Sequence, residues 1–181
     1  MHALARTRRR LRLPGVLAVT AVALLALPAR GALATTRCSD PAGAGGSPVT
    51  VLRLLNAARA GNGVAPLHLD PRLARSARRH SCDMVAHHYF AHDSRSGARF
   101  SARIAWTGWM RGRRHWKVGE NLAWGIGRDA SPPSIVTAWL QSPAHRHILL
   151  HPTFRVVGLG IVPGTPGDPW RGRTYTADFG S

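Results

Sequence analysis

Glu120 is the first residue of this sequence whose type and setting could support chemistry. It is the only glutamate in a chain of 181 residues that holds 25 Lys and Arg, and it lies between Gly119 and Asn121. A glutamate in so Glu-poor a sequence is a candidate functional carboxylate, able to act as a general base or to hold a water. The alternative is a structural glutamate that pairs with a nearby arginine or caps a turn.

His145 is the second candidate. It follows Ser142-Pro143, a pair that predicts a helix start and places His145 in the first helical turn. The positive end of the helix dipole disfavours a charged imidazole there. A neutral His145 could bind a metal or accept a proton, and the alternative is a surface histidine with no chemical role.

Three further histidines, His87, His88 and His92, gather where the second predicted helix ends. Charged imidazoles suit the C-terminal end of a helix dipole. A metal site made from these three alone requires the helix to continue through Tyr89 and Phe90, and their spacing does not select one of them.

Several catalytic signatures are missing from the sequence. It contains no His-Glu-x-x-His, no Gly-x-Ser-x-Gly and no Cys-x-x-Cys. Gly158 and Gly160 lack a third glycine at dinucleotide-binding spacing, so they indicate a tight crossing at a strand. We interpret the neighbouring tryptophans as core residues and not as a sugar-stacking platform: Trp106, Trp109, Trp116 and Trp124.

Periodicity and helix-start signals predict an α+β fold that could position these residues. Ser47-Pro48 and Asp70-Pro71 each combine a capping side chain with proline at the first helical position. Helices are expected over 48–60, 71–87, 133–141 and 145–150, and strands over 156–162 and 174–179, with Trp116 and Val118 in a further strand. Because no βαβ rhythm appears, the sheet is expected to be small and antiparallel.

The N-terminus predicts export. Residues 1–34 combine a basic head, an apolar run from Leu13 to Leu27 and the small-residue segment Ala32-Leu33-Ala34, as in a signal peptide cleaved near Ala34. The run is shorter than the roughly 18 residues of a membrane-spanning helix, so the mature form is expected to be secreted or extracytoplasmic, without a membrane span. Arg8-Arg9-Arg10 suggests the twin-arginine route. Residues 35–47 are expected to be a flexible leader and residues 48–181 the folded domain.

Charge and cysteine content suggest further properties of the mature chain. Its charge of +11 would suit an anionic cell-envelope polymer; the alternative is a compositional arginine bias spread over the surface. No nucleic-acid-binding motif appears, so no nucleic-acid partner is expected. Cys38 and Cys82 are expected to form a disulfide outside the cytoplasm, the alternative being Cys82 as a nucleophile beside His80.

Six short segments together resemble the bacterial branch of the CAP superfamily, the SCP-like extracellular domain of cysteine-rich secretory and plant pathogenesis-related proteins. They occur in the family's order between about residue 49 and residue 181. The matching segments are Leu54-Leu55-Asn56-Ala57-Ala58-Arg59, Tyr89-Phe90-Ala91-His92-Asp93-Ser94, Gly119-Glu120-Asn121-Leu122-Ala123, Ala138-Trp139-Leu140-Gln141-Ser142-Pro143-Ala144-His145-Arg146, Phe154-x-x-Val157-Gly158-Leu159-Gly160 and Tyr175-Thr176-Ala177-Asp178-Phe179-Gly180.

The resemblance implies an α-β-α sandwich whose cleft holds two histidines and two acids. It matches His92 and His145 to the histidines, which can bind a divalent metal, often zinc, and Glu120 to the first acid. Glu120 would hold water near the metal or act as a general base, and Asn121 would brace the loop. The second acid is expected after Trp139, where this chain has Gln141 and Ser142.

Three hypotheses for function follow from the residues and the resemblance. The first is a secreted binding module whose cleft takes a divalent metal and a small apolar or lipid-like ligand. The second is an extracellular hydrolase of peptides or cell-wall material, metal-assisted or using His145 as a base. The third is a basic interaction protein held on anionic envelope polymers.

Overall fold

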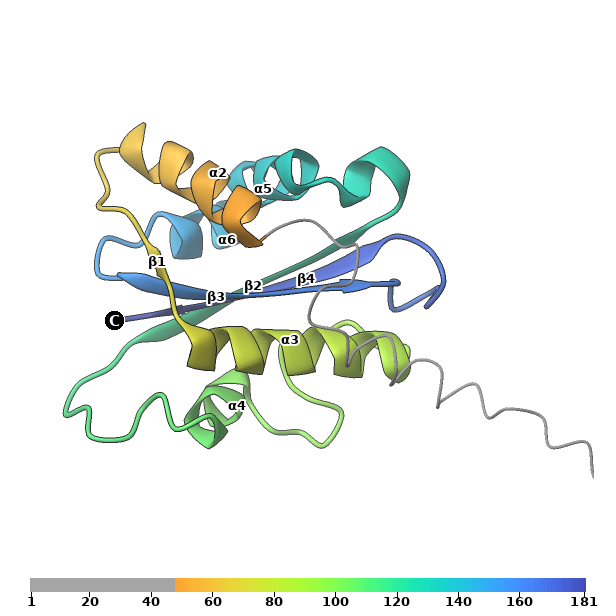
Figure 1. Ribbon diagram of the computed structural model, residues 1–181, viewed down its shortest axis with the longest axis horizontal. Coiled ribbons are helices and arrows are strands. Elements are labelled where there is room, and N and C mark those ends of the chain that lie inside the picture. The colour runs from red at the N-terminus through yellow and green to blue at the C-terminus, as the bar shows by residue number, and fades with distance from the viewer. Residues whose placement is uncertain (1–47) are drawn as a thin grey trace, which may run out of the picture.

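A computed structural model describes residues 48–181 of the chain (Figure 1). The predicted signal peptide, the leader and Cys38 lie outside the described residues, so these three predictions stay predictions. Within residues 48–181, no helix combines the length and apolar character needed to cross a membrane.

A four-stranded sheet forms the centre of the domain, in the order β1-β3-β4-β2. β3 and β2 each pair antiparallel with β4, whereas the two-residue β1 pairs parallel with β3. The prediction of a wholly antiparallel sheet is therefore wrong at β1, because two residues carry no alternating pattern that a sequence can reveal. The strands span His68–Leu69 (β1), Val118–Gly125 (β2), Val156–Pro163 (β3) and Arg173–Gly180 (β4).

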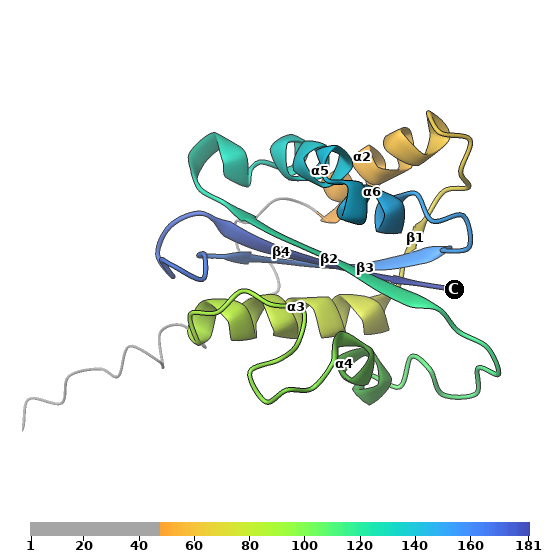
Figure 2. The ribbon, with the colours of Figure 1, turned by 180° about the vertical axis from the view of Figure 1, so that it is seen from behind.

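Helices cover both faces of this sheet, which confirms the predicted α-β-α sandwich (Figures 1 and 2). α2, α5 and α6 lie on one face, and α3 and α4 lie on the other. The helices span Pro48–Ala60 (α2), Pro71–Ala86 (α3), Phe100–Trp106 (α4), Pro132–Gln141 (α5) and Pro143–Leu149 (α6), with a 3-10 turn over Gly127–Ala130 (η1).

The four predicted helices are present, whereas α4 and η1 were not expected. α4 is only seven residues long, and Arg99 makes no side-chain capping bond at its start. Asp70 caps α3 as predicted, accepting hydrogen bonds from the backbone of Arg72 and Leu73. Ser142 is the N-cap residue of α6 and Pro143 follows it, as predicted, but the Ser142 side chain makes no capping hydrogen bond.

The two glycines of β3 allow α3 to lie directly on the sheet. A Cβ added to Gly158 would lie 2.0 Å from the backbone of Leu73, and one added to Gly160 would lie 2.3 Å from the backbone of Ala77. Both distances are far below ordinary van der Waals contact. This confirms the interpretation of these glycines as a tight crossing.

Tryptophan burial only partly follows the sequence prediction. Trp109 is buried beside Leu73 and Ile104 in a small apolar cluster on the α3 side. Trp106, however, is 69 % exposed, and Trp116 and Trp124 are also exposed, so the prediction of a core role is wrong for these three. Trp106 ends the short helix α4, Trp124 lies on the edge strand β2, and Trp116 lies in the segment before β2, so no second layer covers their rings.

Arg59 fixes the segment that carries α6. It is fully buried at the end of α2. Its guanidinium donates hydrogen bonds to backbone carbonyls of the loop after α2, of α6 and of the segment that follows α6. The acceptors are Ala65 at 2.7 Å, Leu149 at 2.7 Å, His151 at 3.2 Å and Phe154 at 3.0 Å. These bonds hold α6, and with it His145, in a defined place.

Candidate functional site

Glu120 lies on β2 with its side chain wholly inaccessible to solvent. One carboxylate oxygen accepts a hydrogen bond from Arg103, forming an ion pair, and the other lies 2.8 Å from Nδ1 of His92. Both alternatives raised by the sequence thus coexist, because the glutamate pairs with an arginine and also contacts a candidate histidine.

Arg103 was not identified from the sequence. It lies on α4, is 7 % exposed, and donates to Glu120 through Nη2. Its Nη1 donates to the backbone carbonyl of His92 at 2.7 Å and to Oγ of Ser94 at 3.3 Å. One guanidinium therefore holds both the carboxylate and the loop that carries His92. Nothing in the sequence separates this arginine from the many others, because α4 itself was not predicted.

His92 has a defined proton arrangement. The carboxylate of Glu120 can only accept, so Nδ1 of His92 carries the proton and a neutral ring presents Nε2 as a lone-pair donor. The hydrogen bond to Glu120 raises the pKa of His92, and burial opposes it in part. The His92 side chain is 53 % exposed, so it is open to solvent although Nδ1 is held by Glu120.

His145 approaches the same strand from the opposite layer. Successive side chains of β2 point to opposite faces, so Glu120 faces α3 and Asn121 faces α6. Nδ2 of Asn121 donates to the backbone carbonyl of His145 at 3.0 Å, which gives Asn121 the bracing role expected of it. Burial lowers the pKa of His145, and the charge of nearby His92 lowers it further, so both effects favour the neutral ring.

Asp178 is a second buried acid beside Glu120, and the sequence analysis did not assign it a role. It lies directly opposite Glu120 in the β2–β4 register and is fully buried. Burial, followed by the charge of Glu120, raises the pKa of Asp178 well above its usual range. The position after Trp139 that resemblance assigned to an acid holds Gln141 and Ser142, so the carboxyl group next to Glu120 comes from β4.

The other histidines near the end of α3 lie elsewhere. Nδ1 of His87 forms an exposed pair with Asp83 at 2.8 Å, and Nδ1 of His88 lies 3.0 Å from the carbonyl of Pro166. Across residues 48–181, no three His, Cys, Asp or Glu side chains are grouped to hold a metal ion. Any cation bound here would therefore rely on fewer than three such ligands from this part of the chain.

The cysteine prediction stays open. Cys82 is partly buried on α3, and its expected partner Cys38 lies outside the described residues.

Comparison with known sequences gives a consistent set of relatives. The family model described as "Cysteine-rich secretory protein family", CAP, matches residues 52–177. YkwD of Bacillus subtilis is 34 % identical over 136 residues, which is 75 % of this chain and 50 % of YkwD. The membrane protein YlbC of the same organism is 32 % identical over 111 residues, 61 % of this chain and 30 % of YlbC. The chain thus spans half or less of the length of these relatives.

Solved structures show the same architecture. An extracellular protein of Bacillus anthracis with an SCP domain is 27 % identical, with a TM-score of 0.59 over 72 % of this chain and 39 % of that protein. An outer surface protein of Borrelia burgdorferi is 20 % identical, with a TM-score of 0.59 over 72 % of this chain and 89 % of that protein. At this identity the second similarity concerns the fold alone.

Proposed function

Since the chain belongs to the CAP family, the cysteine-rich secretory protein family, we propose that it is an extracytoplasmic binding protein whose cleft takes a divalent cation between His92 and His145. The observation that carries this proposal is the bond between Nδ1 of His92 and Glu120 at 2.8 Å. A carboxylate that fixes one ring nitrogen of a histidine leaves the other free to bind metal, as is common around metal sites.

The donor set fits zinc better than magnesium or calcium. Two imidazoles suit zinc and other borderline metals, whereas calcium and magnesium prefer oxygen ligands. His92 and His145 would hold the cation, and Glu120, fixed by Arg103, would orient His92. A divalent cation in such a site supplies Lewis acidity to a water or an oxygen-bearing ligand.

The location outside the cytoplasm is part of the same proposal. The predicted signal peptide supports it, and so do the descriptions of two structural neighbours as an extracellular protein and an outer surface protein. A cleavage assay in a bacterial host, with the mature N-terminus identified by mass spectrometry, tests it. Retention of residues 1–34 on the protein in the cytoplasm would contradict export.

Zinc titration by calorimetry tests the cation site. Wild type should bind one zinc at pH 7.5, and His92→Ala or His145→Ala should weaken binding at least tenfold. His87→Ala is the matched control, because His87 also pairs with a carboxylate at 2.8 Å but lies outside the cleft. Affinity should fall near pH 5, where protons compete for the imidazoles. Equal binding by wild type and by a His92→Ala/His145→Ala variant would refute the site.

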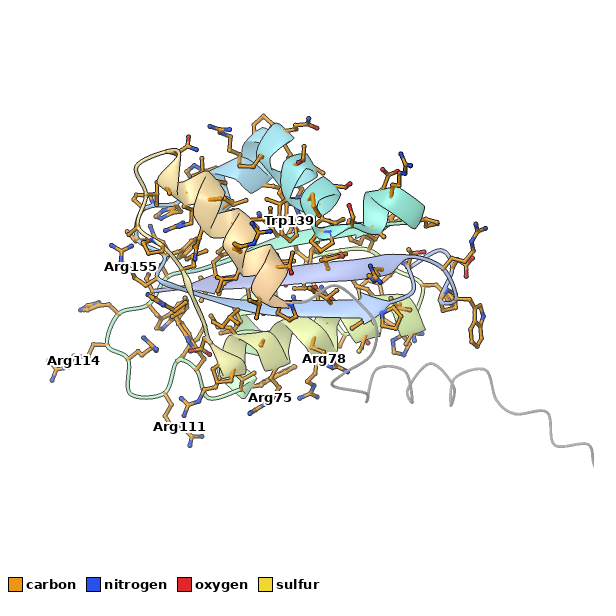
Figure 3. The ribbon with its side chains drawn as sticks, turned by 45° about the horizontal axis from the view of Figure 1, so that its top comes forward. Arg75, Arg78, Arg111, Arg114, Trp139 and Arg155 are labelled. Carbon is orange, nitrogen blue, oxygen red and sulfur yellow. The ribbon has the colours of Figure 1, made fainter. Side chains whose placement is uncertain are left out.

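The charge of the surface favours a second candidate function, association with an anionic envelope polymer. Residues 48–181 carry 18 Arg and Lys against seven Asp and Glu, and one of these arginines, Arg103, forms an ion pair with Glu120. Figure 3 shows Arg75, Arg111 and Arg114 pointing away from the sheet on the α3 side, whereas Trp139 points into the interior.

Retention on phosphocellulose, with neutral cellulose as the control matrix, tests this second candidate. The protein should bind at 50 mM NaCl and elute as salt screens the charges. An Arg75→Gln/Arg111→Gln/Arg114→Gln variant should elute at clearly lower salt, and His92→Ala/His145→Ala should elute as wild type does. Identical elution of wild type and the arginine variant would exclude a role for this face.

A further inference from the structure

A long stretch of the chain without any acidic residue precedes Glu120. Residues 94–119, which we call the basic segment, contain seven Arg and Lys and no Asp or Glu. The segment runs through α4 and the loop that follows it to the start of β2. Of its charged residues, the proposed cation site uses only Arg103, so the other cations have no role in that site.

α3 adds a row of arginines beside the basic segment. Arg72, Arg75 and Arg79 are all exposed, and their spacing of three and four residues places them along one side of the helix. Nη1 of Arg72 donates to the backbone carbonyl of Gly108 at 3.2 Å. This hydrogen bond joins the start of the arginine row to the basic segment.

The two sets of cations belong to one surface of the domain, which we call the α3–α4 face. Figure 3 shows Arg75 of α3 and Arg111 and Arg114 of the basic segment on the same side of the sheet, directed away from it. Positive charge is therefore spread over this whole face and does not come from one helix alone.

The carboxylates nearest this face are mostly held by other groups. Asp70 caps α3. Asp83 pairs with His87 and accepts a hydrogen bond from the hydroxyl of Tyr89. Asp93, exposed at the border of the basic segment, offsets one positive charge at most. The face thus keeps a surplus of positive charge, which suits an anionic partner.

An indole projects from this charged face. Trp106 ends α4 and is 69 % exposed, more than any other large apolar side chain of residues 48–181. It lines the same recess as Arg79, so its ring lies next to the arginine row of α3. Exposed apolar surface rimmed by charged residues is typical of an interaction site.

The charge and the indole together restrict the partner. A polyanion in solution needs only cations and offers no apolar layer to a tryptophan. A bilayer with anionic lipid offers both, because its headgroups attract Arg and Lys and its interface accepts an indole ring with the N–H among the headgroups. The arginine stems can also cover apolar surface while their guanidinium groups stay in water.

We propose that the α3–α4 face docks on a bilayer containing anionic phospholipid, with Trp106 inserted at headgroup level and the arginines of α3 and of the basic segment on lipid phosphates. Docking of this kind rests on the basic surface of the second candidate function and identifies its partner as lipid. The layer of α2, α5 and α6 covers the other face of the sheet, so it would point away from the bilayer.

Titration of the full chain with vesicles of phosphatidylcholine and phosphatidylglycerol tests the role of charge. Vesicles of phosphatidylcholine alone are the control, and EDTA is present, so that no cation in the cleft contributes. All variants carry the same residues 1–47, whose own effect on binding is therefore common to them.

Two triple arginine variants separate the α3–α4 face from total charge. Arg75→Gln/Arg111→Gln/Arg114→Gln should weaken binding about a hundredfold, at roughly fivefold per arginine. The matched control is Arg53→Gln/Arg128→Gln/Arg146→Gln, which removes three exposed arginines from α2, η1 and α6. It should weaken binding less than tenfold.

Quenching by lipids that carry bromine on their acyl chains tests insertion of the indole. The vesicles should quench tryptophan emission of wild type, and Trp106→Ala should lose most of this quenching and weaken binding at least fivefold. Trp124→Ala removes another exposed indole, on β2, and should retain the quenching. Because these side chains are exposed, both variants should keep the melting temperature of wild type.

Three results would overturn lipid docking: equal binding of wild type to anionic and neutral vesicles, equal binding by the two arginine variants, or full quenching in Trp106→Ala. Retention on phosphocellulose without binding to vesicles would refute lipid docking and leave the second candidate function in place. Failure to bind either material would refute both.

Discussion

Glu120→Gln is the substitution that most directly probes how the site is held together. The variant keeps the size of the side chain and removes its charge, so Arg103 stays buried with no ion-pair partner. It also replaces the carboxylate that raises the pKa of His92. Two separate measurements, stability and the titration of one histidine, should therefore respond to a single change.

The stability effect follows from the burial of the pair. Breaking a buried ion pair by removing one partner costs about 3–5 kcal/mol, and the glutamine oxygen can still accept from Arg103, so we expect a loss of about 3 kcal/mol. This is below the roughly 5–15 kcal/mol that typically stabilises a domain, so the variant should still fold. The Asp83–His87 pair is the control, and His87→Ala, which removes its more exposed partner, should cost under about 1 kcal/mol.

The pH dependence has a defined sign. Because the pKa of His92 is raised in the folded state, its pairing with Glu120 contributes fully below the unfolded pKa, about 6.5, and this contribution is lost as pH rises through the folded pKa. The ring is half exposed, so solvent screening limits the effect to roughly 1 kcal/mol. The gap between wild type and Glu120→Gln should thus be larger at pH 5.5 than at pH 8.5.

Urea unfolding at both pH values, with NMR titration of His92, gives the decisive data. Glu120→Gln should lower the pKa of His92, because the hydrogen bond to the Glu120 carboxylate is what raises it. Adding Arg103→Met should cost less than the sum of the two single changes, because the orphaned charge is removed. If Glu120→Gln were no more costly than His87→Ala and left the His92 titration unchanged, the buried network would not hold the site as we describe.

Three further predictions concern the scaffold around the site. Arg59→Met removes the donor to four backbone carbonyls and should cost roughly 3 kcal/mol or more in urea unfolding; a loss under about 1 kcal/mol would contradict this. Gly160→Ala places a Cβ 2.3 Å from the backbone of Ala77 and should lower the melting temperature. Gly167→Ala, whose Cβ would have nothing within 4 Å, should leave it unchanged. Similar melting temperatures for both variants would be inconsistent with the close crossing. Asp178→Asn mimics the protonated acid. Because burial raises the pKa of Asp178, the wild-type protein loses stability as pH rises above about 4. The free energy of unfolding of the variant should therefore increase relative to wild type between pH 4 and pH 8, and a constant difference would refute this.

The sequence was sufficient for the parts of the fold that rest on local signals. Proline after a capping residue and a 3.6-residue period located α3, and strict alternation located β4. The same reasoning missed α4, because seven residues without a side-chain cap carry too little periodic information. Missing α4 also meant missing Arg103, whose role depends on where that helix lies.

The candidate site was only partly predictable for a related reason. Glu120 stood out by composition and His145 by its place at a predicted helix start, whereas His92 was selected by the resemblance of whole segments. Asp178 could not be paired with Glu120 from the sequence, because 58 positions separate them and only the β2–β4 register brings them together. Trp106 was placed in the core by its neighbours in sequence, although exposure depends on which helix face the second layer covers.

The position of β2 at the edge of the sheet explains how residues from two layers can share one site. A central strand separates the side chains of its two faces completely, since each face lies under its own helices. β2 is an edge strand, so no further strand lies between the helix layer on its α3 side and the helix layer on its α6 side. Glu120 therefore holds His92 from one face while Asn121 holds His145 from the other. The two histidines come close enough for the charge of one to lower the pKa of the other. A substitution that moved β2 toward the centre of the sheet would separate them even if every site residue were kept.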